Sequence, residues 1–205
     1  NVVENYSIAA YDSCGNIAPL GVRHNTILLS DSLDKCNASI ILKWNPYINM
    51  PGGLSSYNIM MSENGGPYQL LASVGPADLT YTHMNVKKDS LYCYYIQAVG
   101  DLVTRTASSN KVCTVADVII LPEFTYLKRV TVVSQNEVLI ECFVDTAADI
   151  SRFKLIRSEN NGLSYTYLQD IPFTGSPNIS FTDNTALTDK TSYYYKVVDV
   201  STCNK

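Results

Sequence analysis

The sequence is poor in the residues and runs that several functional classes require. It has two histidines, one tryptophan and six cysteines, none of them in a Cys-x-x-Cys pair. Zinc sites need soft ligands at short spacing, so we expect no metal and no cofactor. The net charge is -4, without a basic run, which argues against a nucleic-acid partner. No apolar stretch approaches ~18 residues, so we expect no membrane span.

Catalytic motifs are also missing. Neither His24 nor His83 has a serine or cysteine nucleophile in a recognisable turn nearby. Glu63 and Glu159 occupy one turn each, whereas general acid/base chemistry on a glycosidic bond needs two carboxylates converging in one cleft. We therefore expect no enzyme activity from these residues.

What the sequence has in abundance is tyrosine, with 15 Tyr against 5 Phe. Tyrosine favours half-buried strands, with its ring inside and its hydroxyl at the rim. The segment SLYCYYIQAV (90–99) alternates with a period of two and so has two faces. The face expected to enter a core carries Tyr92, Tyr94, Ile96 and Ala98, and the outward face carries Cys93, Tyr95, Gln97 and Val99.

One pattern of strands occurs twice along the chain. Four segments of the first copy match four segments of the second in the same order. The matched pairs are SIILKWNPY (39–47) with VLIECFVD (138–145), SYNIMMSENGGPYQLL (56–71) with RFKLIRSENNGLSYTYL (152–168), LTYTHMNV (79–86) with ISFTDNTAL (179–187), and SLYCYYIQAVGD (90–101) with TSYYYKVVDVST (191–202). Four matches in one order indicate a duplicated domain. Short strands separated by turn signals predict antiparallel β-sandwiches. Cys142 falls where Trp44 falls, so we expect Cys142 to be a buried free thiol.

These motifs resemble the fibronectin type III fold. The residues that carry the resemblance are the Trp of ILKW, the Tyr of YNI, and YCYYIQA followed by SSNKV. YDSCGN, HNTILL and LYCYY are similar to tandem modules in surface proteins of Bacteroidetes-type bacteria, including gliding-associated ones. The expected fold class is all-β, with tandem antiparallel sandwiches of the fibronectin type III or immunoglobulin-like kind. In that fold, Tyr92 is the corner tyrosine, bonded to nearby backbone.

The repeat divides the chain into three parts. We expect residues 1–28 to be strands F and G of a preceding module, 29–115 a complete module, and 116–205 a second module lacking its last strand. The chain then reads as a piece of a longer protein. The unpaired edge of the second module could accept a strand from another chain. The alternative is that the first residues pack on the complete module and the edge frays.

The cysteines suggest one disulfide and a weaker second pair. A hairpin centred near residue 103 sets Cys93 opposite Cys113, with both side chains pointing away from the core. A bridge from Cys36 to either of them is the rival. A Cys14–Cys36 pair is suggested because the complete module has no cysteine equivalent to Cys14 and the module after it has none equivalent to Cys36. The linear order of modules argues against this pair. Disulfides fit an oxidising compartment.

Two kinds of surface site follow. Met60, Tyr95, Ile156 and Tyr194 are expected on the outward face of the sheet that contains strands C and F, as an interaction face. The resemblance to Bacteroidetes surface proteins implies O-glycosylation in the pattern Asp-Ser/Thr-apolar, which occurs at Ser32, Ser90 and Thr146. The first two of these are expected in loops.

The predicted function is therefore non-catalytic. We expect a segment of a longer exported bacterial protein, extracellular or at the cell surface, that spaces, adheres or binds a protein. The resemblance further implies association with the outer membrane. The alternative is an accessory or carbohydrate-binding region of a secreted polysaccharide-acting enzyme. The sequence leaves the protein or glycan partner open.

Overall fold

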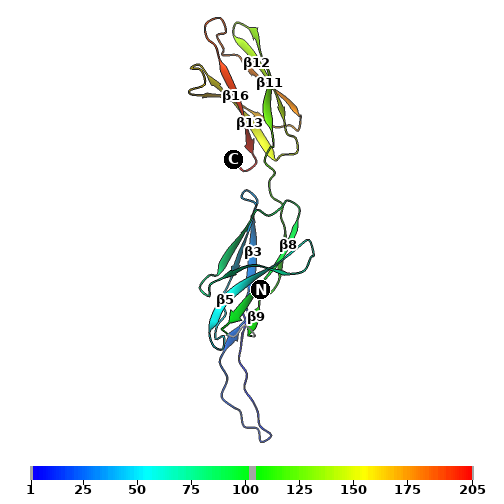
Figure 1. The fold of residues 1–205 in the computed structure, drawn as a ribbon, viewed down its shortest axis with the longest axis vertical. Coiled ribbons are helices and arrows are strands. Elements are labelled where there is room, and N and C mark those ends of the chain that lie inside the picture. Colours follow the sequence, from blue (N-terminus) through cyan, green and yellow to red (C-terminus); the bar gives the residue numbers. More distant parts are fainter. Residues whose placement is uncertain (1, 102–104, 205) are drawn as a thin grey trace. The chain divides into compact units, whose positions relative to one another are not determined.

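The computed structural model describes residues 2–101 and 105–204, whose regular elements are all β-strands. The chain forms two compact units, residues 1–118 and 119–205 (Figure 1). No helix in the described ranges is long and apolar enough to cross a membrane. We describe each unit by itself.

The first unit contains two antiparallel sheets that face each other. One sheet has the order β3-β4-β7, with β3 at Leu29–Asp34, β4 at Ser39–Trp44 and β7 at Thr80–Met84. The other has the order β10-β8-β5-β6, and β9 also pairs with β8. Its strands are β5 (Leu54–Glu63), β6 (Gln69–Val74), β8 (Leu91–Gly100), β9 (Thr106–Ser108) and β10 (Val112–Val115).

The core of the first unit comes from alternate residues of these strands. Ile40, Tyr57, Ile59 and Tyr94 have no exposed surface, and the intervening residues face outward. The two-residue period read from the sequence is confirmed, because one face of each sheet is buried against the other. Tyr92 behaves as the corner tyrosine, since its hydroxyl accepts a hydrogen bond from the backbone N–H of Lys87 at 3.1 Å.

The second unit repeats this architecture with six strands among its described residues, without counterparts of β9 and β10. Its sheets have the orders β11-β12-β15 and β14-β13-β16. The strands are β11 (Thr125–Ser134), β12 (Glu137–Val144), β13 (Ile150–Ser158), β14 (Thr166–Pro172), β15 (Asn178–Asp183) and β16 (Tyr194–Ser201). Counted from β3 in the first unit and from β11 in the second, the first, second and fifth strands form one sheet, and the third, fourth and sixth belong to the other. Cys142 is a free thiol with no exposed surface, as predicted, and burial raises its pKa to about 11.

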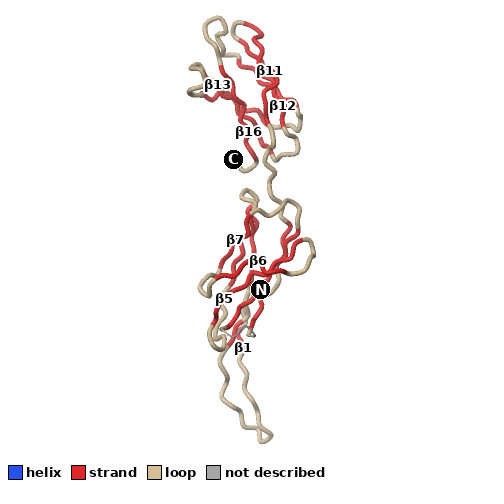
Figure 2. Tube along the Cα trace, viewed as in Figure 1, coloured by secondary structure: helices blue, strands red, loops and turns tan. Residues whose placement is uncertain are grey.

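Residues 4–26 form a long two-stranded hairpin that belongs to the first unit. Its paired strands are β1 (Asn5–Tyr6) and β2 (His24–Asn25), and a bridge joins Tyr11 to Ile17 near the tip. The hairpin extends away from the sandwich, mostly as irregular chain (Figure 2). Its base is held to the β4–β5 loop, where Asn25 Nδ2 donates to the carbonyl of Pro46 at 2.8 Å.

Candidate functional site on the outward sheet faces

The outward face of the larger sheet in the first unit carries a group of aromatic, apolar and cationic side chains. Met60 on β5 lies directly opposite Tyr95 on β8. The Tyr95 ring meets Tyr68 edge to face, with centroids 5.0 Å apart. Lys111 Nζ lies 4.9 Å from the centroid of the Tyr68 ring. We call Met60, Tyr68, Tyr95 and Lys111 the tyrosine–lysine face.

The second unit has a related arrangement on the same face. Lys196 on β16 stands at the position equivalent to Tyr95, and its Nζ lies 4.9 Å from the centroid of the Tyr165 ring. Ile156 on β13 lies opposite Lys196, and Tyr194, 46% exposed, is two residues earlier on β16. The four residues predicted for an interaction face therefore lie outward, two on each unit.

The chemistry of these faces suits recognition rather than catalysis. Tyrosine presents an apolar ring with a hydroxyl at its edge, and a lysine above a ring adds a cation whose position is partly fixed. Such a surface can stack against a sugar ring or fill a protein interface. Sequence reasoning missed Tyr68 and Lys111. The sequence feature that could have identified Tyr68 is its recurrence as Tyr165. Each tyrosine follows the turn after the equivalent strand, β5 in the first unit and β13 in the second.

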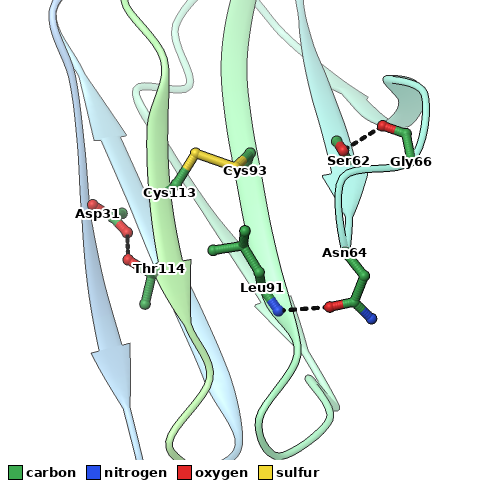
Figure 3. Close-up of a disulfide and its surroundings, with 8 residues drawn as sticks. All are labelled: Asp31, Ser62, Asn64, Gly66, Leu91, Cys93, Cys113 and Thr114. Carbon is green, nitrogen blue, oxygen red and sulfur yellow. Dashed lines mark hydrogen bonds between the residues drawn. A yellow bond between two sulfur atoms is a disulfide. The ribbon is translucent and has the colours of Figure 1, made fainter.

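A disulfide borders the tyrosine–lysine face. Cys93 on β8 and Cys113 on β10 are directly paired in the register, with a Cα–Cα distance of 4.1 Å and an S–S bond of 2.07 Å (Figure 3). On the same strand, the Thr114 hydroxyl donates to the Asp31 carboxylate on β3. Strand β10 is thus joined to one sheet covalently and to the other by a hydrogen bond.

The weaker cysteine pair is contradicted by the structure. Cys14 is a free and exposed thiol at the tip of the hairpin. Cys36 lies in the β3–β4 turn, at one end of β4, whereas the hairpin is anchored beyond the other end of β4 near Pro46. The whole length of the strand separates the two regions, so a Cys14–Cys36 bridge does not form.

The three predicted glycosylation residues lie in different settings. Ser32 is exposed but belongs to strand β3, so its expected place in a loop was wrong. Ser90 precedes β8 and is only 9% exposed, which leaves little access to its hydroxyl in the folded unit. Thr146 lies in the β12–β13 loop and is exposed. Of the three residues, it alone is both in a loop and accessible.

The second unit buries an ion pair between its sheets. Asp183 accepts hydrogen bonds from Arg157 Nη1 and from the Tyr195 hydroxyl, each at 2.8 Å, and from Thr185. Burial opposes ionisation of Asp183, but these hydrogen bonds outweigh it and lower the pKa of its carboxyl. Arg157 also lies over the Tyr193 ring, with 4.5 Å to the centroid. The carboxylate is saturated with donors, which suits a structural role better than that of a base.

A neutral contact takes this place in the first unit. His83 is at the position equivalent to Asp183, and its Nδ1 lies 2.7 Å from the hydroxyl of Tyr94, the counterpart of Tyr195. Burial lowers the pKa of His83, and Glu63 only partly offsets this effect. The His83 ring meets the rings of both Tyr92 and Tyr94 edge to face. Across residues 2–101 and 105–204, no three His, Cys, Asp or Glu side chains are placed to hold a metal ion.

Comparison with known proteins finds similar chains among solved structures alone. No protein-family model and no curated protein matches it. Among solved structures, it is similar to a two-domain fibronectin type III segment of chicken tenascin, with 9% identity, a TM-score of 0.37, and coverage of 84% of this chain and 89% of that one. It is also similar to the FN1-FN3 domains of chicken CNTN1, with 12% identity, a TM-score of 0.43, and coverage of 98% and 73%.

The strand order of the two units defines the class of protein. Each unit is an antiparallel β-sandwich of the fibronectin type III or immunoglobulin-like kind, and the two stand in tandem along the chain. The fold class predicted from the repeat is therefore confirmed.

Proposed function

We propose that this chain is a non-catalytic tandem segment of a longer exported protein, and that its task is to bind a protein partner while spacing other parts of that protein. The observation that carries the proposal is the pairing of lysine with tyrosine on the outward face of both units, at Tyr68 and Lys111 and again at Tyr165 and Lys196. The Cys93–Cys113 disulfide supports an oxidising, extracellular or cell-surface location.

The proposal also covers the parent protein. Residues 1–28 are the last two strands of a preceding sandwich, and the parent is a bacterial surface protein of the Bacteroidetes type, associated with the outer membrane. What supports the first point is the hairpin of residues 4–26, whose apolar side chains have no sandwich to cover them among the described residues. The second point rests on the sequence resemblance alone.

Binding of the immobilised chain to the surface of the producing cells tests the interaction role. Tyr95→Ala removes the aromatic contact with Tyr68 and should reduce the bound fraction about tenfold, the effect of losing one interface hot spot. Tyr11→Ala, which removes a 71% exposed tyrosine from the hairpin, serves as the matched control and should leave binding unchanged. Equal loss in both variants, or in neither, contradicts the proposed face.

A carbohydrate-binding role within a secreted polysaccharide-acting enzyme is the second candidate. The half-buried edge-to-face tyrosine pair favours it, since aromatic rings stack on sugars. A glycan array distinguishes the two roles. Binding of a defined oligosaccharide that is lost in Tyr95→Ala supports the carbohydrate role, and binding to protease-treated cells should then persist. A protein partner predicts that protease treatment abolishes binding.

A further inference from the structure

Three aromatic side chains gather on the outward face of the β11-β12-β15 sheet in the second unit. Tyr126 on β11 lies directly opposite Phe143 on β12, and their ring centroids are 5.5 Å apart. Phe124, just before β11, stacks on Phe143 with the two rings within 6° of parallel and 5.7 Å between centroids. The Phe124 centroid is also 5.9 Å from that of Tyr126. We call these three residues the ring platform.

The ring platform faces solvent. Tyr126 and Phe124 are 53% and 40% exposed. Phe143 alternates along β12 with the buried Cys142 and Val144, so its ring points away from the core. Aromatic side chains carry a large apolar area, and a group of them that stays on the surface marks a site of contact with a ligand or partner.

A polar hollow adjoins the ring platform. It has a volume of about 120 Å³, and the side chains at its wall include those of Lys128, Glu141, Asn178 and Ser180. Lys128 Nζ donates a hydrogen bond to Asn178 Oδ1 at 3.0 Å. Asn178 on β15 is directly opposite Phe143, so the hollow begins beside the rings.

The hollow offers hydrogen-bond donors and acceptors together. The ammonium of Lys128 donates, the carboxylate of Glu141 accepts, and the hydroxyl of Ser180 does both. A ligand that fits the whole site therefore needs an apolar face for the rings and, at its edge, groups that both donate and accept.

Charge around the site is mixed. Arg129 forms an ion pair with Glu141. The remaining cation, Lys128, is offset by carboxylates on the other side of the platform, where the backbone N–H of Glu123 donates to Asp145 Oδ2 at 3.1 Å. Because neither sign dominates, the site favours a neutral ligand over a strongly charged one.

A hexopyranose has this chemistry. The C–H groups on one side of its ring form an apolar face that stacks on aromatic side chains, and its hydroxyl groups donate and accept hydrogen bonds. A protein partner fits less well, because the cores of protein interfaces are depleted in charged groups such as those at the wall of the hollow.

The same corner of the first unit is built differently. Thr26, Leu28 and Asn45 stand at the positions equivalent to Phe124, Tyr126 and Phe143. The Asn45 side chain holds the local backbone, since its Oδ1 accepts from the N–H of Leu28 at 2.7 Å and its Nδ2 donates to the carbonyl of Thr26 at 3.0 Å. The repeat has thus replaced a structural contact with three surface rings in the second unit.

We propose that the ring platform and the adjoining hollow bind a neutral hexopyranose unit of an oligosaccharide. The sugar ring stacks on Tyr126 and Phe143, and its hydroxyl groups reach Lys128 and Glu141. This site lies on the sheet opposite the one that carries Lys196, so it is separate from the faces to which the proposed function assigns protein binding.

An array of defined neutral and acidic oligosaccharides, probed with the full chain, tests the site. We expect at least one neutral oligosaccharide to bind, and its signal to fall about tenfold in Tyr126→Ala, the scale of one lost interface aromatic. Tyr167→Ala is the matched control. Tyr167 lies on β14 in the opposite sheet and is 56% exposed, close to the 53% of Tyr126, so this variant should keep full binding.

A second variant probes the hollow without touching the rings. Lys128→Met keeps an unbranched apolar side chain and removes the ammonium, so the signal of the same oligosaccharide should fall about fivefold, the scale of one lost hydrogen bond. Thermal melting followed by circular dichroism checks that both variants fold like the unaltered chain.

Several results would overturn the proposal. They are an array on which no neutral oligosaccharide is bound, full binding in Tyr126→Ala, and an equal loss in Tyr167→Ala. Protease-sensitive binding to cells that is lost in Tyr126→Ala without any array signal would show a protein partner instead. Array binding that is lost in Tyr95→Ala but kept in Tyr126→Ala would assign the sugar to the tyrosine–lysine face, which overturns this site and leaves the second candidate function standing.

Discussion

The residues that differ between the repeats show how one fold tolerates two kinds of buried polar contact. Asp183 and Arg157 form an ion pair whose side chains are 1% and 13% exposed, whereas His83 and Tyr94 form a neutral contact at the same place. Removing one partner of a buried pair is costly, because the other charge stays buried without compensation. Each unit should therefore respond differently to mutation and to pH.

Asp183→Asn should destabilise the second unit by about 3 kcal/mol, because Arg157 then loses its charged partner in a buried site. Urea unfolding followed by circular dichroism measures the loss. Asp170→Asn is the matched control. Its partner Arg152 and Asp170 itself are about one-third exposed, so the loss should stay under about 1 kcal/mol. Equal losses in the two variants would contradict a special role for the buried pair.

The first unit should lose stability in mild acid. The folded-state pKa of His83 lies below its unfolded value, so the unfolded chain takes up the proton first. Its contribution is present above the unfolded pKa of about 6.5 and is lost as the pH falls towards the folded value. The thermal midpoint of the first unit should drop between about pH 7 and about pH 5. In His83→Asn this pH dependence should flatten, and an unchanged slope would assign the effect to another group.

At the scale of elements, the sequence predicts strands well and side-chain networks poorly. The alternation around Tyr94 identifies a strand and its buried face, because a period of two follows directly from the pleated backbone. The contact of Lys111 with Tyr68 joins the residue just before β10 to the residue just before β6, and the sequence gives no register between them before the sheet is formed. The suggested Cys14–Cys36 pair was wrong, as the linear order of modules already argued, because a count of cysteines does not show which of them lie close together.

The disulfide between β8 and β10 should stabilise the first unit. Its cysteines are 20 residues apart, and closing a loop of that length removes about 3 kcal/mol of conformational entropy from the unfolded chain. Cys93→Ala with Cys113→Ala should lower the free energy of unfolding by that amount, as measured by fluorescence of Trp44. Peptide mapping without reduction checks the bond itself, and two free thiols at these positions would refute it.

At the scale of the whole molecule, each unit has its own hydrophobic core. Two unfolding transitions are therefore expected. The single tryptophan, Trp44, belongs to the first core and is 6% exposed, so its fluorescence should report only the first unit. Asp183→Asn should shift the unfolding transition of the second unit, which circular dichroism detects, and should leave the transition followed by Trp44 fluorescence unchanged. A common shift in both signals would show that the units unfold together.

The pairing of Cys93 with Cys113 also sets how the chain carries tension. A force applied to the chain beyond Cys113 passes through the sulfur atoms to Cys93, near the start of β8, and the segment between the two cysteines bears none of it. If the first unit is stretched until it opens, those 20 residues stay folded back, which shortens the released length by about 70 Å. Reduction of the disulfide would lengthen the stretched chain by that amount. The disulfide therefore limits how far the first unit can extend, and this limit depends on redox conditions.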